Sequence, residues 1–315
     1  MLNMSSSSPP PTQQEWQRSG TCPEGTVPVL RTHARNTTRA ANFPMTPFFK
    51  ESLAANGVTT EAAYAYSTNG PYHGANADIY LWDIHVEPNE YSTNFIAVGG
   101  DADGRPLVND PSVDNAILVG WMAAPPLYGD SKPRLYVYWT NDGGRSKNCW
   151  NFDCGGFVQT SKKISLGASF SPTSKPGGEQ RHTTDAAEPK WWVSVNLEEV
   201  GYLPDFVFNN FVESFLNGWG GQLLNTNPGG QHTSTQMGSG RFPSEGINYA
   251  GMIGKYLAVD YNGELANDYP AGSKVTQSSC YDYKDLGRQE PEPGYYILYG
   301  GPVALTVLTV QRVKV

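Results

Sequence analysis

Cysteine is the residue type whose spacing most directly indicates chemistry in this chain. Cys149 and Cys154 flank the tetrapeptide Trp-Asn-Phe-Asp. This separation can close a small loop through a disulfide if both side chains turn inward. Two unrelated buried thiols are the alternative, and a zinc site would need two more soft ligands nearby. The spacing favours a Cys149–Cys154 disulfide, whereas Cys22 and Cys280 could pair with each other or with cysteines outside this chain.

Histidine and serine offer the other candidates for acid–base or nucleophilic chemistry. His182 and His232 lie in polar segments without the spacing of a metal site or a nucleophile elbow. Ser239 lies between two glycines, but the Gly-x-Ser-x-Gly pattern that exposes a nucleophilic serine is absent. A structural role is therefore favoured for both histidines and a tight turn for Ser239. Generic motifs identify no active site, no metal site and no cofactor.

Composition and charge exclude several classes of protein. Only 17% of the 315 residues are charged and 12% are aromatic, which does not fit disorder, a coiled coil or collagen. There are 22 basic and 30 acidic residues, and Lys and Arg nowhere cluster beyond a pair, so nucleic acid is a poor partner. The longest near-apolar run, residues 303–310, is too short to span a membrane. A soluble chain that can build a sizeable core is expected.

Short β-strands must position any site in this chain. The 34 Gly and 24 Pro residues separate runs that are rich in β-branched and aromatic residues. These runs are residues 79–82, 94–98, 116–119, 135–139, 157–159, 164–166, 191–195, 256–259 and 295–299. Their spacing predicts an all-β fold, either a barrel or an antiparallel β-sandwich of two large sheets. One stretch differs, because Phe208, Phe211, Val212 and Phe215 recur at three- and four-residue steps, which predicts one short helix near 205–217.

Longer signatures in the chain are similar to those of one peptidase family. They are Gly74-Ala75-Asn76-Ala77, Gly120-Trp121, Leu127-Tyr128-Gly129-Asp130, Tyr138-Trp139-Thr140, the loop from Cys149 to Cys154 with Gly156-Phe157-Val158-Gln159, Trp191-Trp192, Gly201-Tyr202-x-Pro204, Trp219-Gly220-Gly221, residues 231–240, Phe242-Pro243-x-Glu245-Gly246 and Tyr299-Gly300-Gly301-Pro302. In this order they resemble the neprosin family, plant glutamic peptidases whose type member cleaves after proline. The resemblance implies an antiparallel β-sandwich, secretion to an extracellular or vacuolar location, and an acidic working compartment.

The resemblance also bears on the two ends of the chain. Residues 1–20 are rich in Ser, Pro and Gln, a composition that buries little apolar surface, and residues 16–31 resemble the end of the family's pro-region. We therefore expect a disordered tail and pro-region remnant over residues 1–50 and a neprosin-like domain over residues 51–315. No secretory signal is visible at the start, and the sequon at Asn36 would be glycosylated only in a secreted chain. The family usually ends with a cysteine soon after Gly-Gly-Pro; residues 303–310 stand there instead, which leaves Cys280 without its expected partner.

Two glutamates carry the chemistry of the family, one as general base for water and the other to stabilise the developing oxyanion. The first stands two residues before the Gly-Trp pair, where this chain has Leu118. The second directly follows Trp-Gly-Gly, where this chain has Gln222. The Gln222 amide can donate an N–H to an oxyanion but cannot act as a base, and Leu118 can do neither. Asp114 lies four residues before Leu118, about 13 Å away on a regular strand and beyond the roughly 3 Å reach of proton transfer.

The resemblance and the two substitutions together predict an inactive pseudopeptidase. Its ligand would be a proline-rich peptide or another extracellular molecule. The expected cleft is lined by Trp121, Tyr138, Trp139, Trp219 and Gln236, although the same rings could be core. An active prolyl endopeptidase, with Asp114, Asp101 or Asp103 as the base, and an enzyme of another class that reuses the cleft remain the alternatives.

Overall fold

Two large antiparallel β-sheets form the protein. The computed structural model describes residues 12–31, 58–102, 113–188, 191–227 and 232–301. The seven-stranded sheet has the order β16 (Gly272–Val275), β2 (Thr59–Ser67), β13 (Leu216–Asn225), β4 (Ser92–Gly100), β5 (Asn115–Ala123), β6 (Arg134–Thr140) and β7 (Cys149–Trp150). The nine-stranded sheet has the order β17 (Asp282–Arg288), β18 (Tyr295–Gly300), β14 (Gly251–Val259), β3 (Gly74–Tyr80), β10 (His182–Glu188), β11 (Trp192–Val195), β12 (Glu198–Tyr202) and β8 (Val158–Gln159), with β15 (Leu265–Ala266) beside β14.

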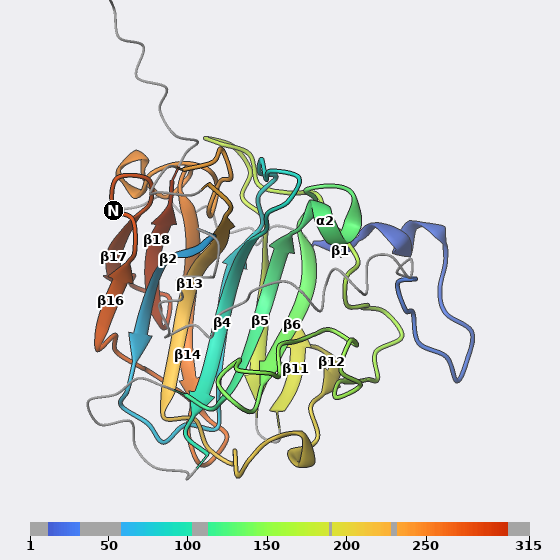
Figure 1. Ribbon diagram of the computed structural model, residues 1–315. Helices are drawn as coiled ribbons and strands as arrows, with labels where there is room; N and C mark the ends of the chain where they lie inside the picture. The colour runs from blue at the N-terminus through green and yellow to red at the C-terminus, as the bar shows by residue number, and fades with distance from the viewer. Residues whose placement is uncertain (1–11, 32–57, 103–112, 189–190, 228–231, 302–315) are drawn as a thin grey trace, which may run out of the picture.

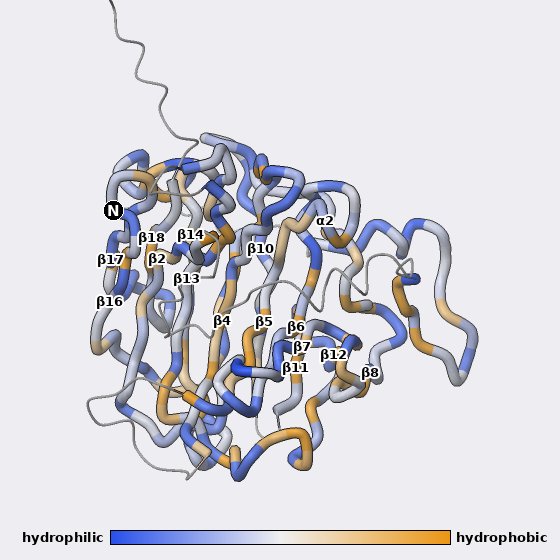
Figure 2. The backbone as a smooth tube through the Cα atoms, viewed as in Figure 1, coloured by the Kyte–Doolittle hydropathy of each residue, from blue (hydrophilic) through white to orange (hydrophobic). Residues whose placement is uncertain are grey.

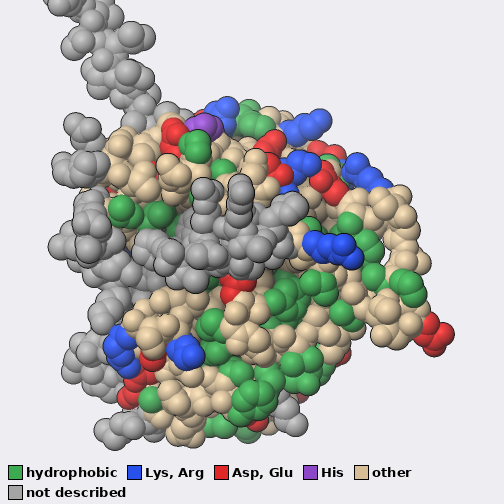
Figure 3. All heavy atoms as spheres, turned by 45° about the vertical axis from the view of Figure 1, so that its right-hand side comes forward, with side chains coloured by type: hydrophobic (Ala, Val, Ile, Leu, Met, Phe, Trp, Pro, Cys, Tyr) green, Lys and Arg blue, Asp and Glu red, His purple; other side chains and the backbone are tan. Residues whose placement is uncertain are grey.

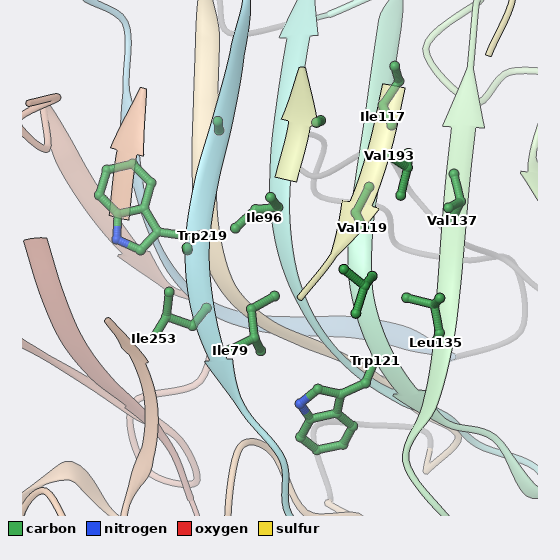
Figure 4. Packing of buried hydrophobic residues seen from close by; sticks show 14 of the residues in the cluster. Ile79, Ile96, Ile117, Val119, Trp121, Leu135, Val137, Val193, Trp219 and Ile253 are labelled. Atoms are coloured by element: carbon green, nitrogen blue, oxygen red, sulfur yellow. The ribbon is translucent and has the colours of Figure 1, made fainter. Parts of the chain in front are cut away.

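The two sheets pack face to face and enclose the main core. In Figure 1 the strands from β16 to β6 form the front layer, and β14, β18 and β11 lie behind them. Figure 4 shows side chains of both sheets meeting in this layer, among them Ile79 and Ile253 from the nine-stranded sheet and Ile96, Ile117 and Trp219 from the seven-stranded sheet. The prediction of an all-β sandwich is confirmed.

The seven-stranded sheet is buried on both faces. Along β5, Ile117, Val119 and Trp121 point into the core between the sheets, and Leu118 and Met122 point to the opposite face, where they join a second buried cluster. A strand buried on both sides reads as a continuous apolar run, and Figure 2 shows hydrophobic residues along β4, β5 and β6 with hydrophilic residues in the connecting loops. On the face drawn in Figure 3, Lys and Arg side chains are scattered.

Little of the described chain is helical. One short α-helix, α2 (Pro125–Tyr128), follows β5, and 3-10 turns occupy η1 (Glu15–Ser19), η3 (Asp205–Val207) and η4 (Pro243–Glu245). None of the described helices is long and apolar enough to cross a membrane.

The expected helix near 205–217 is wrong. After η3 the chain makes a series of bends and enters β13 at Leu216. Phe208 packs edge-on against Trp139 at 5.7 Å, whereas Phe211 stacks on Trp191 at 4.1 Å. Between them Asn210 has a φ of 52°, which a right-handed helix does not allow. The two phenylalanine rings also contact each other edge-on at 5.2 Å, so the aromatic spacing reflects packing of an irregular segment against Trp139 and Trp191.

The run at residues 164–166, which was expected to be a strand, is irregular, and a side chain supplies its hydrogen bonds. The amide of Gln14 donates to the carbonyl oxygen of Ser165 at 2.8 Å, and its Oε1 accepts from the Ser165 N–H at 2.8 Å. Gln14 is 1% exposed and belongs to β1 (Gln13–Gln14), which pairs with β9 (Phe170–Ser171). Part of the N-terminal segment thus packs on the sandwich, which its polar composition did not predict.

Candidate functional site

Leu118 and Gln222 lie on the same face of the seven-stranded sheet, the face turned away from the nine-stranded sheet. Leu118 pairs with Ala97 on β4 and with Tyr138 on β6, and Gln222 pairs with Thr93 on β4. Thr93 and Ala97 are four residues apart, and positions separated by an even number of residues share a face. We call this side of the sheet, defined by Leu118 and Gln222, the substituted face.

The two positions are separated by strand β4 and are not in contact. They are four residues apart along the strands and two strands apart across the sheet. At about 3.3 Å per residue and about 4.8 Å per strand, this places their Cα atoms roughly 16 Å apart. The middle of the gap is occupied by Phe95, which pairs with Gly120 on one side and Gly220 on the other.

Both substituted positions are packed into the fold. Leu118 is 1% exposed and Gln222 is 2% exposed. The Gln222 side chain forms a hydrogen bond with the hydroxyl of Tyr91, whose pKa is raised because the phenol is fully buried. The Gln222 carbonyl oxygen also accepts a hydrogen bond from Thr93 Oγ1 at 3.0 Å. Gln222 thus serves as a hydrogen-bonding group and Leu118 as an apolar packing group.

Four aromatic rings gather at the β6–β7 side of the substituted face. Trp150 lies 6.0 Å from Tyr91, 5.5 Å from Tyr136 and 5.3 Å from Tyr138 between ring centroids. We call these four residues the aromatic box. All four are buried, and the Trp150 indole N–H has no hydrogen-bond partner among the described residues. The Tyr136 hydroxyl is likewise buried without such a partner, so the site is apolar with two unused polar groups.

The disulfide holds Trp150 in the box. Cys149 and Cys154 are bonded, with sulfur atoms 2.01 Å apart, so the predicted pairing is confirmed. Trp150 directly follows Cys149 on β7 and pairs with Tyr138 on β6. Cys22 and Cys280 are both free thiols in this structure, and burial raises the pKa of the Cys280 thiol.

The five residues expected to line a cleft are not brought together. Trp121, Trp139 and Trp219 lie in the core between the sheets, and Tyr138 alone of the four rings lies on the substituted face. The Trp121 indole N–H donates to the carbonyl oxygen of Tyr80 at 2.9 Å, and Trp219 stacks on Tyr256 at 3.5 Å.

Gln236 lies in a loop away from the sheet. Its Oε1 accepts from the N–H of His85 at 2.8 Å.

Sequence reasoning missed three members of the aromatic box: Tyr91, Tyr136 and Trp150. Tyr136 and Tyr138 alternate along one strand, and this pattern could have indicated that their rings lie on the same face of the sheet.

Carboxylates within the seven strands do not reach the substituted face. Glu61 on β2 is the only acidic residue in these strands, and it is directly followed by Ala62, the partner of Gln222. Adjacent strand residues point to opposite faces, so Glu61 faces the other side. Asp114, just before β5, accepts a hydrogen bond from Arg145 at 2.9 Å. Asp101 follows β4, and Asp103 and Asn36 lie outside the described residues.

Glu61 belongs to a buried polar network that anchors the segment after β13. His232 Nδ1 lies 3.1 Å from Glu61, and Asn225 donates to Glu61 at 2.9 Å. Burial raises the pKa of Glu61. Glu90 accepts hydrogen bonds from the backbone N–H and the hydroxyl of Thr226 and from the hydroxyls of Thr233 and Thr235.

These contacts give His232 a structural role. His182, the other histidine candidate, lies on β10, where its ring is 5.2 Å from that of Tyr80. No group of three His, Cys, Asp or Glu side chains in the described ranges is placed to hold a metal ion.

The comparison with protein families agrees with this architecture. The family model described as Neprosin matches residues 88–302, which is more than half of the chain. The matched range runs from just before β4 to just past β18 and includes Leu118, Gln222 and the disulfide. The chain therefore belongs to the neprosin family.

Proposed function

We propose that this neprosin-family protein is a catalytically inactive pseudopeptidase that binds an extracellular ligand, with a proline-rich peptide as the first candidate, on the substituted face. The observation that carries the proposal is the absence of a carboxylate on this face within its seven described strands. Attack of water on an amide needs a base to take the proton, and losing such a group commonly costs on the order of a hundredfold or more in rate. Leu118 and Gln222 supply no base.

The aromatic box supports binding of a ligand with flat apolar rings. Prolyl rings pack well on aromatic faces, and the free indole N–H of Trp150 can donate to a backbone carbonyl of a bound peptide. The Gln222 amide offers a second polar contact. Because these side chains are buried in this structure, ligand binding requires their exposure.

Secretion forms part of the proposal. A disulfide in a closed loop persists in oxidising compartments, which include the extracellular space. Membership of the neprosin family supports the same location and an acidic working environment.

The proposal is tested by incubating the full chain with a proline-rich peptide at acidic and neutral pH. We expect no cleavage by mass spectrometry, and binding by calorimetry that the Trp150→Phe variant weakens. Phe206→Ala, at a side chain 85% exposed on η3, is the matched control and should bind as the unmodified protein does. Cleavage that Gln222→Ala abolishes would show an active peptidase and refute the proposal.

A further inference from the structure

Two segments that connect strands bring three polar donor atoms together at the surface. His85 and Glu87 lie in the segment between β3 and β4, and Ser234 lies in the segment between β13 and β14. His85 Nε2 is 3.0 Å from Ser234 Oγ and 3.4 Å from Glu87 Oε1. The Ser234 hydroxyl donates a hydrogen bond to the same Glu87 oxygen. We call these three residues the His–Glu–Ser cluster.

Buried and exposed residues alternate along the first segment, and this alternation turns His85 and Glu87 toward solvent. Ile84 and Val86 are each 4% exposed and belong to the main core. The alternation is typical of an extended chain, in which residues two apart lie on the same side. The side chains of His85 and Glu87 are 55% and 37% exposed. A solute can therefore reach both of them directly.

Hydrogen bonds hold the two segments in a fixed relation. The His85 N–H donates to Gln236 Oε1 at 2.8 Å, and the Gln236 N–H donates to the carbonyl oxygen of His85 at 3.0 Å. The Glu87 N–H donates to Thr235 Oγ1 at 3.0 Å, and Thr235 is fully buried. These bonds place Ser234 beside His85 although the two residues are 149 positions apart in the sequence.

The charge of Glu87 is not neutralised by a basic side chain. The hydrogen bond from Ser234 lowers the pKa of Glu87, and the neighbouring His85 also lowers it, so Glu87 remains a carboxylate in mild acid. Its ion pair within the described residues is with His85, and no Lys or Arg there pairs with it. A carboxylate and an imidazole are therefore available together to a cation from solution.

The spacing of the donor atoms fits the coordination sphere of a small divalent cation. Zinc binds imidazole nitrogen at about 2.0–2.1 Å and carboxylate oxygen at about 2.0–2.2 Å, which places two of its ligand atoms roughly 3.0–3.5 Å apart. Both distances from His85 Nε2, 3.0 Å and 3.4 Å, agree with this range. The third side of the triangle, the hydrogen bond between Ser234 and Glu87, is shorter and must open when a cation enters.

We propose that the His–Glu–Ser cluster binds a late first-row divalent cation such as Zn²⁺, with His85 Nε2, Glu87 Oε1 and Ser234 Oγ as ligands and water in the remaining positions. Imidazole favours such cations over Ca²⁺ and Mg²⁺, which prefer oxygen ligands. Two strong ligands and one hydroxyl make an open site, unlike the four-ligand sites that stabilise small zinc domains. The site lies on connecting segments, so it is separate from the substituted face.

The chain offers a matched control pair. His73 Nε2 lies 3.4 Å from Glu213 Oε1, the same separation as between His85 and Glu87. The side chains of His73 and Glu213 are also partly exposed, at 27% and 37%. Among the described residues, no hydroxyl is hydrogen-bonded to this second pair. It therefore tests whether an exposed histidine and glutamate are enough to bind the cation.

The test is calorimetric titration of the untagged full chain with zinc chloride at neutral pH. Cys22 and Cys280, which are free thiols, are first replaced with alanine, because thiolates bind zinc and would compete. We expect zinc to bind, and calcium chloride in about tenfold excess not to displace it, since Ca²⁺ prefers a shell of oxygen ligands.

The variants separate the cluster from other sites. His85→Ala and Glu87→Gln should each weaken zinc binding about tenfold or more, and Ser234→Ala about threefold or more. His73→Ala should change the dissociation constant less than about twofold. Without zinc, all four variants should melt within about 2 °C of the parent protein, because their side chains are not part of the core.

Four results would overturn the proposal. The first is the absence of zinc binding at about 1 mM, a concentration that detects weak complexes. The second is a dissociation constant that either His85→Ala or Glu87→Gln leaves unchanged. The third is an unchanged constant in Ser234→Ala, which would remove the hydroxyl from the site. The fourth is equal weakening by His73→Ala, which would show that zinc binds exposed histidines without regard to the cluster.

Discussion

Leu118 is a single residue whose surroundings decide what the substituted face can do. It is 1% exposed, and its neighbours in register are Ala97 and Tyr138. The basic residue on the adjacent strands β4 and β6 is Arg134, which lies four residues from Tyr138, about 13 Å along β6, and is paired with Asp130 at 2.7 Å. The position where the resemblance places a catalytic glutamate is therefore occupied by a side chain that fits the surrounding apolar packing.

The Leu118→Glu substitution should destabilise the protein strongly at neutral pH. A buried charge without a partner costs about 3–5 kcal/mol, and protonation removes most of that cost in acid. Urea unfolding at neutral and acidic pH measures the effect. Leu118→Met, which conserves volume, should cost less than about 1.5 kcal/mol. Equal unfolding midpoints for the Glu variant and the unmodified protein would contradict the packing described here.

Asp185 should make the protein more stable in acid than at neutral pH. It is 1% exposed, and burial raises its pKa to about 7, a rise to which the charge of Asp78 adds. Between about pH 4 and pH 7 the folded protein keeps a proton that the unfolded chain releases. This stabilisation is complete below about pH 4 and is lost as pH rises through 7, by up to about 4 kcal/mol.

The Asp185→Asn variant isolates this effect. Its free energy of unfolding should vary less with pH between 4 and 7 than that of the unmodified protein, and it should be the more stable of the two above pH 7. Glu15 and Glu198, whose pKa values are lowered by their lysine partners and nearby hydroxyls, contribute the opposite slope in acid equally in both proteins. Parallel curves would show that Asp185 does not titrate in this range.

Some residues of the site could be predicted from the sequence and others could not. Leu118 and Gln222 were identified because fixed motifs, Gly-Trp and Trp-Gly-Gly, lie beside them. The expected cleft combined Tyr138 with Trp139, but neighbouring residues of a strand point to opposite faces. Trp150 was missed because its place depends on β7 joining β6, a pairing that no local pattern encodes.

At the scale of elements, several long strands were predicted, but β2, β10, β13 and β17 were not, and two irregular segments were misassigned. β4, β5, β6 and β14 coincide with apolar runs because both of their faces are buried. The segment at 205–217 and the run at 164–166 were misassigned because their partners are distant in sequence. Trp139 and Trp191 fix the first, and Gln14 fixes the second.

The disulfide is an element whose removal should be measurable. Closing a loop this short removes unfolded-state entropy worth about 2 kcal/mol. Replacing both Cys149 and Cys154 with alanine should lower the free energy of unfolding by that amount and alter the fluorescence of Trp150. Cys22→Ala, at a free thiol, is the control and should change stability by less than about 0.5 kcal/mol. An unchanged midpoint in the double variant would show that the loop is held by other contacts.

For the whole molecule, the N-terminal segment should contribute to stability through one side chain. Gln14 makes two 2.8 Å hydrogen bonds to the Ser165 backbone and is 1% exposed. Gln14→Ala leaves a buried N–H and C=O without partners, which should cost about 2 kcal/mol or more in thermal or urea unfolding. Gln13→Ala, at an exposed side chain, should cost less than about 0.5 kcal/mol. A Gln14→Ala protein as stable as the control would show that residues 12–31 add nothing to the fold.

The order of strands in the two sheets has a consequence for how the newly synthesised chain folds. β2 pairs with β13, β3 pairs with β14, and β18, the last described strand, fills the place between β14 and β17. During translation, β2 and β3 therefore leave the ribosome long before their partner strands β13 and β14 have been synthesised. Sheets assembled from such distant partners fold slowly, on a scale of about milliseconds to seconds, and unpaired edges invite aggregation meanwhile. This sandwich can be completed only once β18 has been synthesised, so its yield in a cell depends on protection of the nascent chain until that strand is available.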